Sequence, residues 1–180
     1  MKQFLLPVWE ILETLIIALV SILIIYTFMA QPFVVDGASM EPNFQDGNYL
    51  IVDEMTYRFR EPQRGEVVVF YNPRNESEIY IKRIIGLPGE QVSVSGDEVK
   101  INGKILHESY MRIAGSVLGA KVFDLAPNEY FMMGDNRLNS SDSRIWGPLK
   151  RNDIIGTVRL RFWPPGKLDI FREAISYTFS

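Results

Sequence analysis

Three stretches of this 180-residue chain carry side chains that could do covalent chemistry. A serine, Ser39, stands among small residues and before a proline in residues 37–42, Gly-Ala-Ser-Met-Glu-Pro. A lysine, Lys82, lies in the apolar run 80–85, Tyr-Ile-Lys-Arg-Ile-Ile, and a polar loop covers 134–147. A serine hydroxyl becomes a good nucleophile when a neighbouring base takes its proton. The first question is therefore which base this chain provides.

Histidine and metal chemistry are not indicated. The chain has no cysteine and a single histidine, His107, which stands in a short strand-like run with no evident acid partner. A Ser-His-Asp arrangement is therefore disfavoured, and the usual zinc ligand sets cannot be assembled. No aspartate occupies the Asp-Thr/Ser-Gly turn of aspartic proteases. We expect no metal and no cofactor, which leaves a serine activated by lysine.

A lysine can act as a base only when its amine is neutral. Its ordinary pKa of about 10.4 must fall by roughly two to three units, and burial among apolar groups can cause a shift of that size. Lys82 is the lysine set within an apolar strand pattern, where Tyr80, Lys82 and Ile84 share one face. The alternatives are an edge-strand lysine that covers apolar surface with its stem, a turn-capping Ser39 and a solvated loop 134–147.

An uncharged apolar segment precedes the serine. Residues 14–35 contain no charge, and residues 15–29 are mostly Ile, Leu, Val, Ala and Phe, which is long enough for a transmembrane helix. Trp9 and Tyr26 stand near its ends, as expected at a lipid–water boundary. The alternatives are a buried core helix and a cleaved signal peptide, although no clear small-x-small cleavage site follows the segment. A retained anchor is the interpretation that we adopt.

The distribution of charge predicts the orientation in the membrane, and the net charge argues against one class of partner. Lys2 and the amino terminus precede the apolar segment, whereas the first charges after it are acidic: Asp36, Glu41, Asp46, Asp53 and Glu54. The positive-inside tendency then leaves most of the chain outside the cytoplasm. A net charge of −3 argues against nucleic acid as the main partner, because binding phosphates needs clustered cations.

The rest of the chain has the pattern of a mainly β protein. Short runs of β-forming residues, separated by turn residues, predict strands over 49–52, 66–71, 78–85, 91–95, 98–101, 130–133 and 154–162. Asn102-Gly103 predicts a tight hairpin between 99–101 and 104–106. A turn or two of helix is expected over 168–175. Together these patterns predict a membrane helix followed by a curved antiparallel β-sheet or partial barrel.

In combination and in order, the three segments resemble the type I signal peptidases, the bacterial leader peptidase family, in its short form. These are membrane-anchored serine/lysine endopeptidases that release secretory proteins. The resemblance implies that Ser39 is the nucleophile and Lys82 the general base. It implies that the Ser140 hydroxyl orients the lysine, and that Asp142 and Arg144 form a structural ion pair beside the site.

The resemblance also implies where substrate binds, and the chain departs from the family pattern at three positions. Gly37 stands where some members have a serine that donates to the oxyanion, so the oxyanion region would rely on backbone around Gly37 and Ser39. Asn43 replaces a common threonine, with no evident catalytic consequence, and Glu66 replaces an aspartate in the strand before the lysine. The expected pockets for small substrate side chains are lined by Phe33, Val35, Met40, Tyr80 and Ile81.

The resemblance completes the expected organisation. Residues 1–31 would form a cytoplasmic tip and anchor, and residues 32–180 an extracytoplasmic catalytic domain with a short cap-like insertion over 87–128. The expected partners are secretory preproteins and the lipid bilayer of a cell membrane or thylakoid-type membrane. Two alternatives stay open: a serine/lysine processing peptidase with a single dedicated substrate, and a membrane-anchored β-domain that binds without catalysis.

Overall fold

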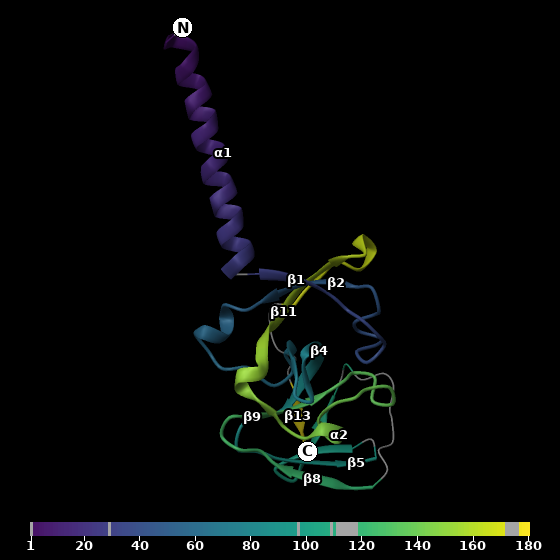
Figure 1. The fold of residues 1–180 in the computed structure, drawn as a ribbon. Helices are drawn as coiled ribbons and strands as arrows, with labels where there is room; N and C mark the ends of the chain where they lie inside the picture. The colour runs from purple at the N-terminus through teal and green to yellow at the C-terminus, as the bar shows by residue number, and fades with distance from the viewer. Residues whose placement is uncertain (1, 29, 97, 109, 111–118, 172–176) are drawn as a thin grey trace.

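A computed structural model describes residues 2–28, 30–96, 98–108, 110, 119–171 and 177–180. Helix α1 (Lys2–Phe28) projects away from a body that contains the strands of the protein (Figure 1). Within the described residues, no helix combines the length and the apolar character needed to cross a bilayer. The membrane anchor stays a prediction.

The body contains a large antiparallel sheet. Its strands lie in the order β1-β2-β11-β3-β4-β9-β10, with β12 paired to β11. Their bounds are β1 (Ala30–Val34), β2 (Tyr49–Asp53), β3 (Val67–Asn72), β4 (Asn75–Gly86), β9 (Glu129–Met133), β10 (Leu149–Lys150), β11 (Ile154–Trp163) and β12 (Asp169–Ile170). Register shifts interrupt the pairing of β11 with both β2 and β3, and such bulges increase the local twist of a sheet.

A second antiparallel sheet has the order β13-β7-β6-β5-β8. Its strands are β5 (Gln91–Ser95), β6 (Glu98–Ile101), β7 (Lys104–His107), β8 (Lys121–Asp124) and β13 (Thr178–Phe179). The predicted hairpin joins β6 to β7, and both Asn102 and Gly103 have the positive φ that a two-residue type I′ turn requires. This sheet is built from the segment between β4 and β9, closed by the end of the chain.

The short helical elements all lie in connections. They are η1 (Thr56–Arg58), α2 (Ser143–Trp146), η2 (Arg151–Asp153) and η3 (Pro165–Lys167). Glu66, just before β3, accepts hydrogen bonds from Tyr57 Oη at 2.9 Å and from the Gln63 N–H at 2.8 Å. Glu66, one of the three departures noted in the sequence, therefore connects the η1 region to the start of β3.

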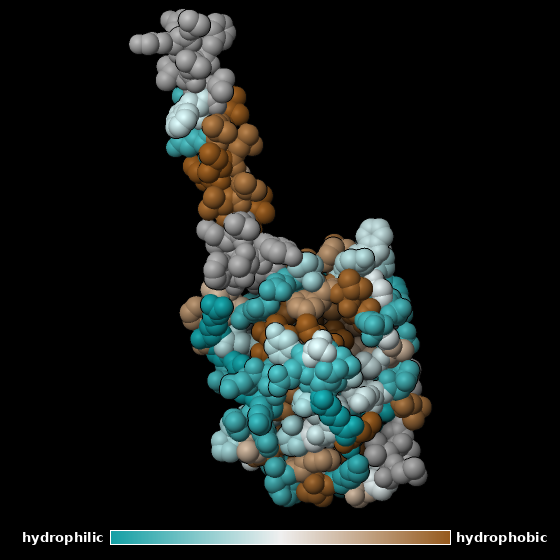
Figure 2. Space-filling view, viewed as in Figure 1, coloured by the Kyte–Doolittle hydropathy of each residue, from teal (hydrophilic) through white to brown (hydrophobic). Residues whose placement is uncertain are grey.

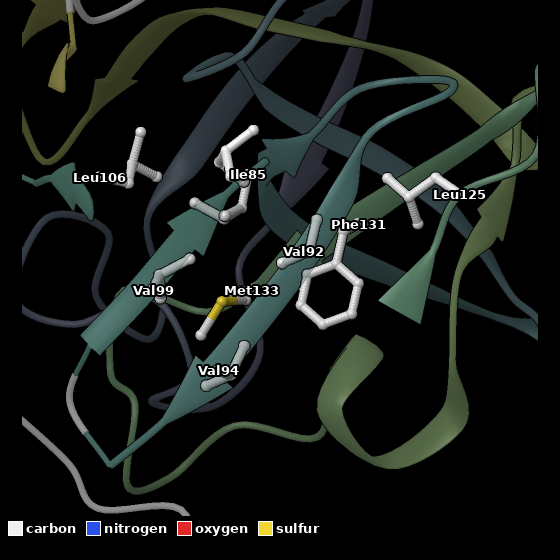
Figure 3. Packing of buried hydrophobic residues seen from close by; sticks show 9 residues of the cluster. Ile85, Val92, Val94, Val99, Leu106, Leu125, Phe131 and Met133 are labelled. Carbon is white, nitrogen blue, oxygen red and sulfur yellow. The ribbon is translucent and has the colours of Figure 1, made fainter. Parts of the chain in front are cut away.

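Apolar side chains fuse the two sheets. Figure 3 shows one core cluster in which Ile85 of β4 and Phe131 and Met133 of β9 pack against side chains of the second sheet. The members drawn from the second sheet and its flanks include Val92, Val94, Val99, Leu106 and Leu125. A second cluster, with Met40, Phe44 and Val52, lies beneath the turn that carries Ser39. Burial of these side chains anchors both β4 and that turn to one body.

The mainly β class is confirmed, and each strand expected from the sequence has a counterpart. The differences are short strands. β1 follows α1 closely and pairs with β2, so residues 30–31, which the sequence assigns to the end of the anchor, form the start of a strand. The helix expected over 168–175 is wrong at residues 169–170, which form β12 on the edge of β11, and residues 172–176 lie outside the described residues.

Candidate active site

Ser39 lies in the turn between β1 and β2. Its neighbour Met40 is fully buried, and the Phe44 N–H donates to the Met40 carbonyl at 2.9 Å, which closes one helical turn. Ser39 itself is partly exposed. A buried anchor on one side and solvent on the other present its hydroxyl at the surface of the body.

Lys82 reaches this hydroxyl from the middle of β4. Its Nζ is 2.7 Å from Ser39 Oγ and 2.8 Å from the Ile81 carbonyl oxygen, and the residue is only 4% exposed. Nζ also lies 5.3 Å from the centre of the Tyr80 ring, the neighbour expected on the same strand face. Two residues 43 positions apart in the chain are therefore in direct contact.

The surroundings of Lys82 favour its neutral amine. Burial lowers the pKa of Lys82 from 10.5 to about 8, although the nearby carboxylates of Asp142 and Asp135 act in the opposite direction. Desolvation dominates because a charged ammonium loses its hydration when it is buried. A neutral amine can accept the proton of Ser39 at the observed separation.

The loop 134–147 packs against both residues. Asp142 caps α2, pairs through Oδ1 with Arg144 Nε at 2.7 Å and accepts the Gly134 N–H at 3.0 Å. The ion pair expected between Asp142 and Arg144 is therefore present and buried. It joins the start of the loop to α2 and keeps the loop compact beside Lys82.

Three loop residues that the sequence did not single out contact the serine turn. The Asn136 N–H donates to the Ser39 carbonyl at 3.1 Å, and Asn136 Nδ2 donates to the Ala38 carbonyl at 3.1 Å. Gly134 approaches so closely that a Cβ there would come within 2.4 Å of the Ser39 carbonyl oxygen. Asp135 forms a buried, two-bond ion pair with Arg83. The only signal was a dense polar loop between buried apolar residues, which requires internal hydrogen bonds.

Ser140 does not make the contact expected of it. Its Oγ is buried and has no hydrogen-bond partner among the described residues, and the acceptors found for Lys82 Nζ are Ser39 Oγ and the Ile81 carbonyl. Ser140 nevertheless lies at the site, because a Cβ on Gly134 would fall 2.3 Å from its hydroxyl. In this structure the Ile81 carbonyl, and not the Ser140 hydroxyl, accepts a hydrogen bond from Lys82 Nζ.

The backbone near Gly37 is also arranged differently from the expectation. The Gly37 N–H donates to Asp46 Oδ1 at 2.9 Å, so it is already engaged. Within the described residues, the Ser39 N–H makes no hydrogen bond. Of the two backbone donors expected for an oxyanion, the one at Ser39 is available here.

A cavity of about 250 Å³ opens beside Ser39 and Lys82. Four of the five expected substrate-binding residues line it: Phe33, Val35, Tyr80 and Ile81. Met40 does not line it. Its side chain points into the core cluster with Phe44 and is fully buried, because the turn uses it as an anchor. His107 does not line this cavity either, and its ring forms a hydrogen bond with the Ser180 hydroxyl at 2.8 Å.

Comparison with known proteins places this chain in a family. The family model described as signal peptidase, peptidase S26, matches residues 8–163. A probable signal peptidase I-2 of Synechocystis sp. is 38% identical over 177 residues, covering 92% of this chain and 80% of the relative. A signal peptidase I of Leptolyngbya laminosa is 37% identical over 179 residues, covering 95% and 87%.

A crystal structure of a signal peptidase I from Enterococcus faecalis is 32% identical, with a TM-score of 0.49, covering 54% of this chain and 97% of that one. The family model and the two relatives span most of the chain, including both Ser39 and Lys82. The chain belongs to the signal peptidase family, peptidase S26, and is a serine peptidase that removes signal peptides by the family's Ser-Lys mechanism.

Proposed function

We propose that Ser39 is the nucleophile and Lys82 the general base of this peptidase. The observation that carries the proposal is the 2.7 Å contact between Ser39 Oγ and a buried lysine whose pKa is lowered to about 8. Neutral Lys82 accepts the Ser39 proton as Oγ attacks the scissile carbonyl carbon. The C–N bond breaks, the leaving amine takes a proton from the Lys82 ammonium, and an ester-linked acyl-enzyme forms.

Deacylation uses the same pair in the second half of the reaction. Neutral Lys82 takes a proton from water, the hydroxyl attacks the ester, and Ser39 leaves with a proton returned by Lys82. The Ser39 N–H stabilises the oxyanion in both halves, and such a donor is typically worth about 3 kcal/mol. Asp142 and Arg144 hold the loop beside the lysine, and the buried Ser140 hydroxyl lies against Gly134 within that loop.

The proposed substrates are secretory preproteins with small residues before the cleavage site. Val35 and Ile81 line the cavity beside Ser39, and its volume of about 250 Å³ lies below the roughly 300–1,000 Å³ of drug-sized ligand sites. An extended substrate would pair its backbone with the free edge of β4, because β9 pairs with β4 only from Arg83 onward in the described residues. A large side chain at the cleavage site should therefore clash with the cavity wall.

We further propose that the apolar segment anchors the enzyme in a bilayer. Residues 1–31 form the tip and anchor, residues 32–180 the extracytoplasmic catalytic domain, and residues 87–128 its cap-like insertion. Support comes from α1, where Leu15, Leu19 and Ile22 are each more than 60% exposed. Figure 2 shows hydrophobic surface over the middle part of the helix, and exposed apolar patches of this kind mark a lipid or protein partner.

The dyad is tested by replacing each residue and measuring cleavage of a preprotein by the detergent-solubilised full chain. Ser39→Ala and Lys82→Arg should both abolish turnover, the second because arginine stays protonated. Ser95→Ala and Lys100→Arg in the second sheet serve as matched controls and should cleave like the wild type. Near-normal turnover by Lys82→Arg would exclude a neutral amine as base.

A folded wild-type chain that cut no preprotein would instead favour a binding module. Identification of the amino termini released from a mixture of preproteins separates a general processing enzyme from one with a single substrate. We expect many products that share small residues before the cut. One product alone would point to a dedicated processing peptidase.

A further inference from the structure

Asn43 connects the serine turn to three other parts of the molecule. Its Nδ2 donates to Asp135 Oδ2 at 2.9 Å and to the Tyr110 carbonyl at 3.3 Å, and its own carbonyl accepts a hydrogen bond from Arg161. These partners belong to the loop 134–147, to the region after β7 and to β11. Asn43 is four residues from Ser39, within the turn that presents the hydroxyl.

Asp135 carries this connection on to the strand of the general base. Its two oxygens bind Arg83 Nε at 2.8 Å and Arg83 Nη2 at 2.6 Å, and Arg83 immediately follows Lys82 in β4. Asp135 is 1% and Arg83 4% exposed, so the pair is withdrawn from solvent. The path Asn43–Asp135–Arg83 thus closes a bridge between the nucleophile's turn and the base's strand.

An aromatic ring covers part of the bridge, and Asn43, Arg83 and Tyr110 also line a cavity of about 490 Å³. The Tyr110 ring lies over the Arg83 guanidinium at 4.1 Å, and the Tyr110 carbonyl accepts the second hydrogen bond of Asn43. Hydrogen bonds to a buried carboxylate are strong because water cannot replace them. The Asn43 amide donates to the Asp135 carboxylate, which is itself held by Arg83. We therefore expect these bonds to limit movement of the serine turn relative to β4.

A second contact holds the turn at its other end. Asn136 donates to the carbonyls of Ser39 and Ala38 from the same loop. Asn136 therefore bonds the turn at Ser39, and Asn43 bonds it beyond Pro42, so that the turn is held at two points by one loop.

We propose that Asn43 is a positioning residue for the cleavage reaction, holding Ser39 against Lys82 through Asp135 and Arg83. The inference rests on the proposed function, in which these two residues carry the chemistry. Asn43 does not line the cavity beside Ser39, so its proposed role acts through the geometry of the dyad and not through a contact with substrate in that cavity. The replacement of the family's common threonine by asparagine then has a consequence, because the longer amide reaches the carboxylate.

The test compares full-length Asn43→Ala and Asn43→Asp with wild type in detergent, using a peptide that contains a signal-peptide cleavage site. Misplacement by about 1 Å costs up to a hundredfold in rate, so Asn43→Ala should lower kcat about ten- to a hundredfold with KM unchanged. Asn43→Asp, which sets a second carboxylate against Asp135, should lower kcat further. The pH midpoint of Asn43→Ala should stay near that of wild type, because Lys82 remains buried.

Asn75→Ala is the matched control, since it removes an exposed amide bound to Glu78, away from the turn. Melting curves establish the folded fraction of each variant, and kcat is expressed per folded molecule. Wild-type kcat in folded Asn43→Ala would overturn the positioning role, as would a loss confined to KM. Loss of cleavage by Ser39→Ala alongside normal Asn43→Ala would leave the dyad standing while the inference fails; an unaffected Ser39→Ala would refute the proposed function itself.

Discussion

At the residue scale, the chemistry of Lys82 depends on a balance between burial and charge. Burial lowers the pKa of the amine to about 8, while Asp142 and Asp135 favour the ammonium. Each carboxylate has a cationic partner of its own, Arg144 and Arg83, which offsets its charge. Because desolvation wins, a useful fraction of the amine is neutral near physiological pH; for a pKa of about 8 this is about a tenth at pH 7.

Activity should therefore rise with pH through the pKa of Lys82. The value of kcat/KM reports groups in the free enzyme, so it should increase about tenfold from pH 7 upward and level off above about pH 9, with a midpoint near 8. A pH series of initial rates on a peptide substrate measures this. A flat profile between pH 6 and 9 would contradict a titrating lysine base.

Stability offers an independent reading of the same group. Between pH of about 8 and 10.5 the unfolded chain binds more protons at Lys82 than the folded chain does, so wild-type stability rises with pH there. Lys82→Met removes the cost of a buried ammonium and should stabilise the fold by about 3 kcal/mol below pH 8. Urea unfolding at pH 7 and at pH 10 should show that the extra stability of Lys82→Met over wild type shrinks as pH rises. Extra stability that did not change with pH would argue against a lowered pKa for Lys82.

At the element scale, the site exists because one loop closes over one turn. The loop 134–147 leaves β9, passes within hydrogen-bonding distance of the Ser39 backbone and returns through α2. Gly134 marks the closest approach, where a Cβ would lie 2.4 Å from the Ser39 carbonyl oxygen and 2.3 Å from Ser140 Oγ. Glycine is required at position 134 because a side chain would not fit there, and not because the backbone has an unusual conformation.

Gly134→Ala should therefore damage catalysis more than the fold. Overpacking costs about 1–3 kcal/mol, and the displaced Ser39 backbone should lower kcat about a hundredfold. Gly166→Ala is the matched control, because nothing lies within 4 Å of a Cβ there. Rates and melting temperatures of the two variants provide the comparison. Wild-type turnover by Gly134→Ala would show that the contact with Ser39 relaxes freely.

At the scale of the whole molecule, the chain joins an apolar helix to a body with two fused sheets. The second sheet supplies the core that supports β4 and β9 from below, and a buried ion pair between Arg137 and Glu108 links it to the loop 134–147. The exposed apolar side chains of α1 have no comparable cover in the described residues. The proposed anchor attributes their exposure to contact with lipid.

A charge placed in α1 tests that attribution. A lysine at the centre of a spanning helix costs about 2.5–3.5 kcal/mol on insertion. Ile17→Lys should therefore release part of the protein from membranes during alkaline extraction, whereas wild type should stay in the pellet. Val122→Lys, an equally exposed apolar site in β8, is the control. Complete extraction of wild type would contradict the anchor.

Sequence pattern alone predicted the mainly β body and the hairpin at Asn102-Gly103, whereas the pairing of Ser39 with Lys82 also required the resemblance to a family. Strand periodicity and turn chemistry are local, so they can be read without coordinates. The dyad was accessible because elimination left few bases and a motif resemblance selected one. Local pattern missed β12. The resemblance misassigned Met40, since a side chain next to a nucleophile can face either the substrate or the core.

What the sequence by itself determined is which groups are available: a serine, an apolar strand with one lysine, and a loop rich in partners. The tertiary structure alone decided their relations. It placed the Ile81 carbonyl, and not Ser140, on the lysine, engaged the Gly37 N–H with Asp46, and drew Asn43 to Asp135. Some of these contacts join residues that are distant in sequence, and the others depend on which N–H or carbonyl group the fold leaves free. Burial in the folded chain then sets the pKa of Lys82, on which the chemistry depends.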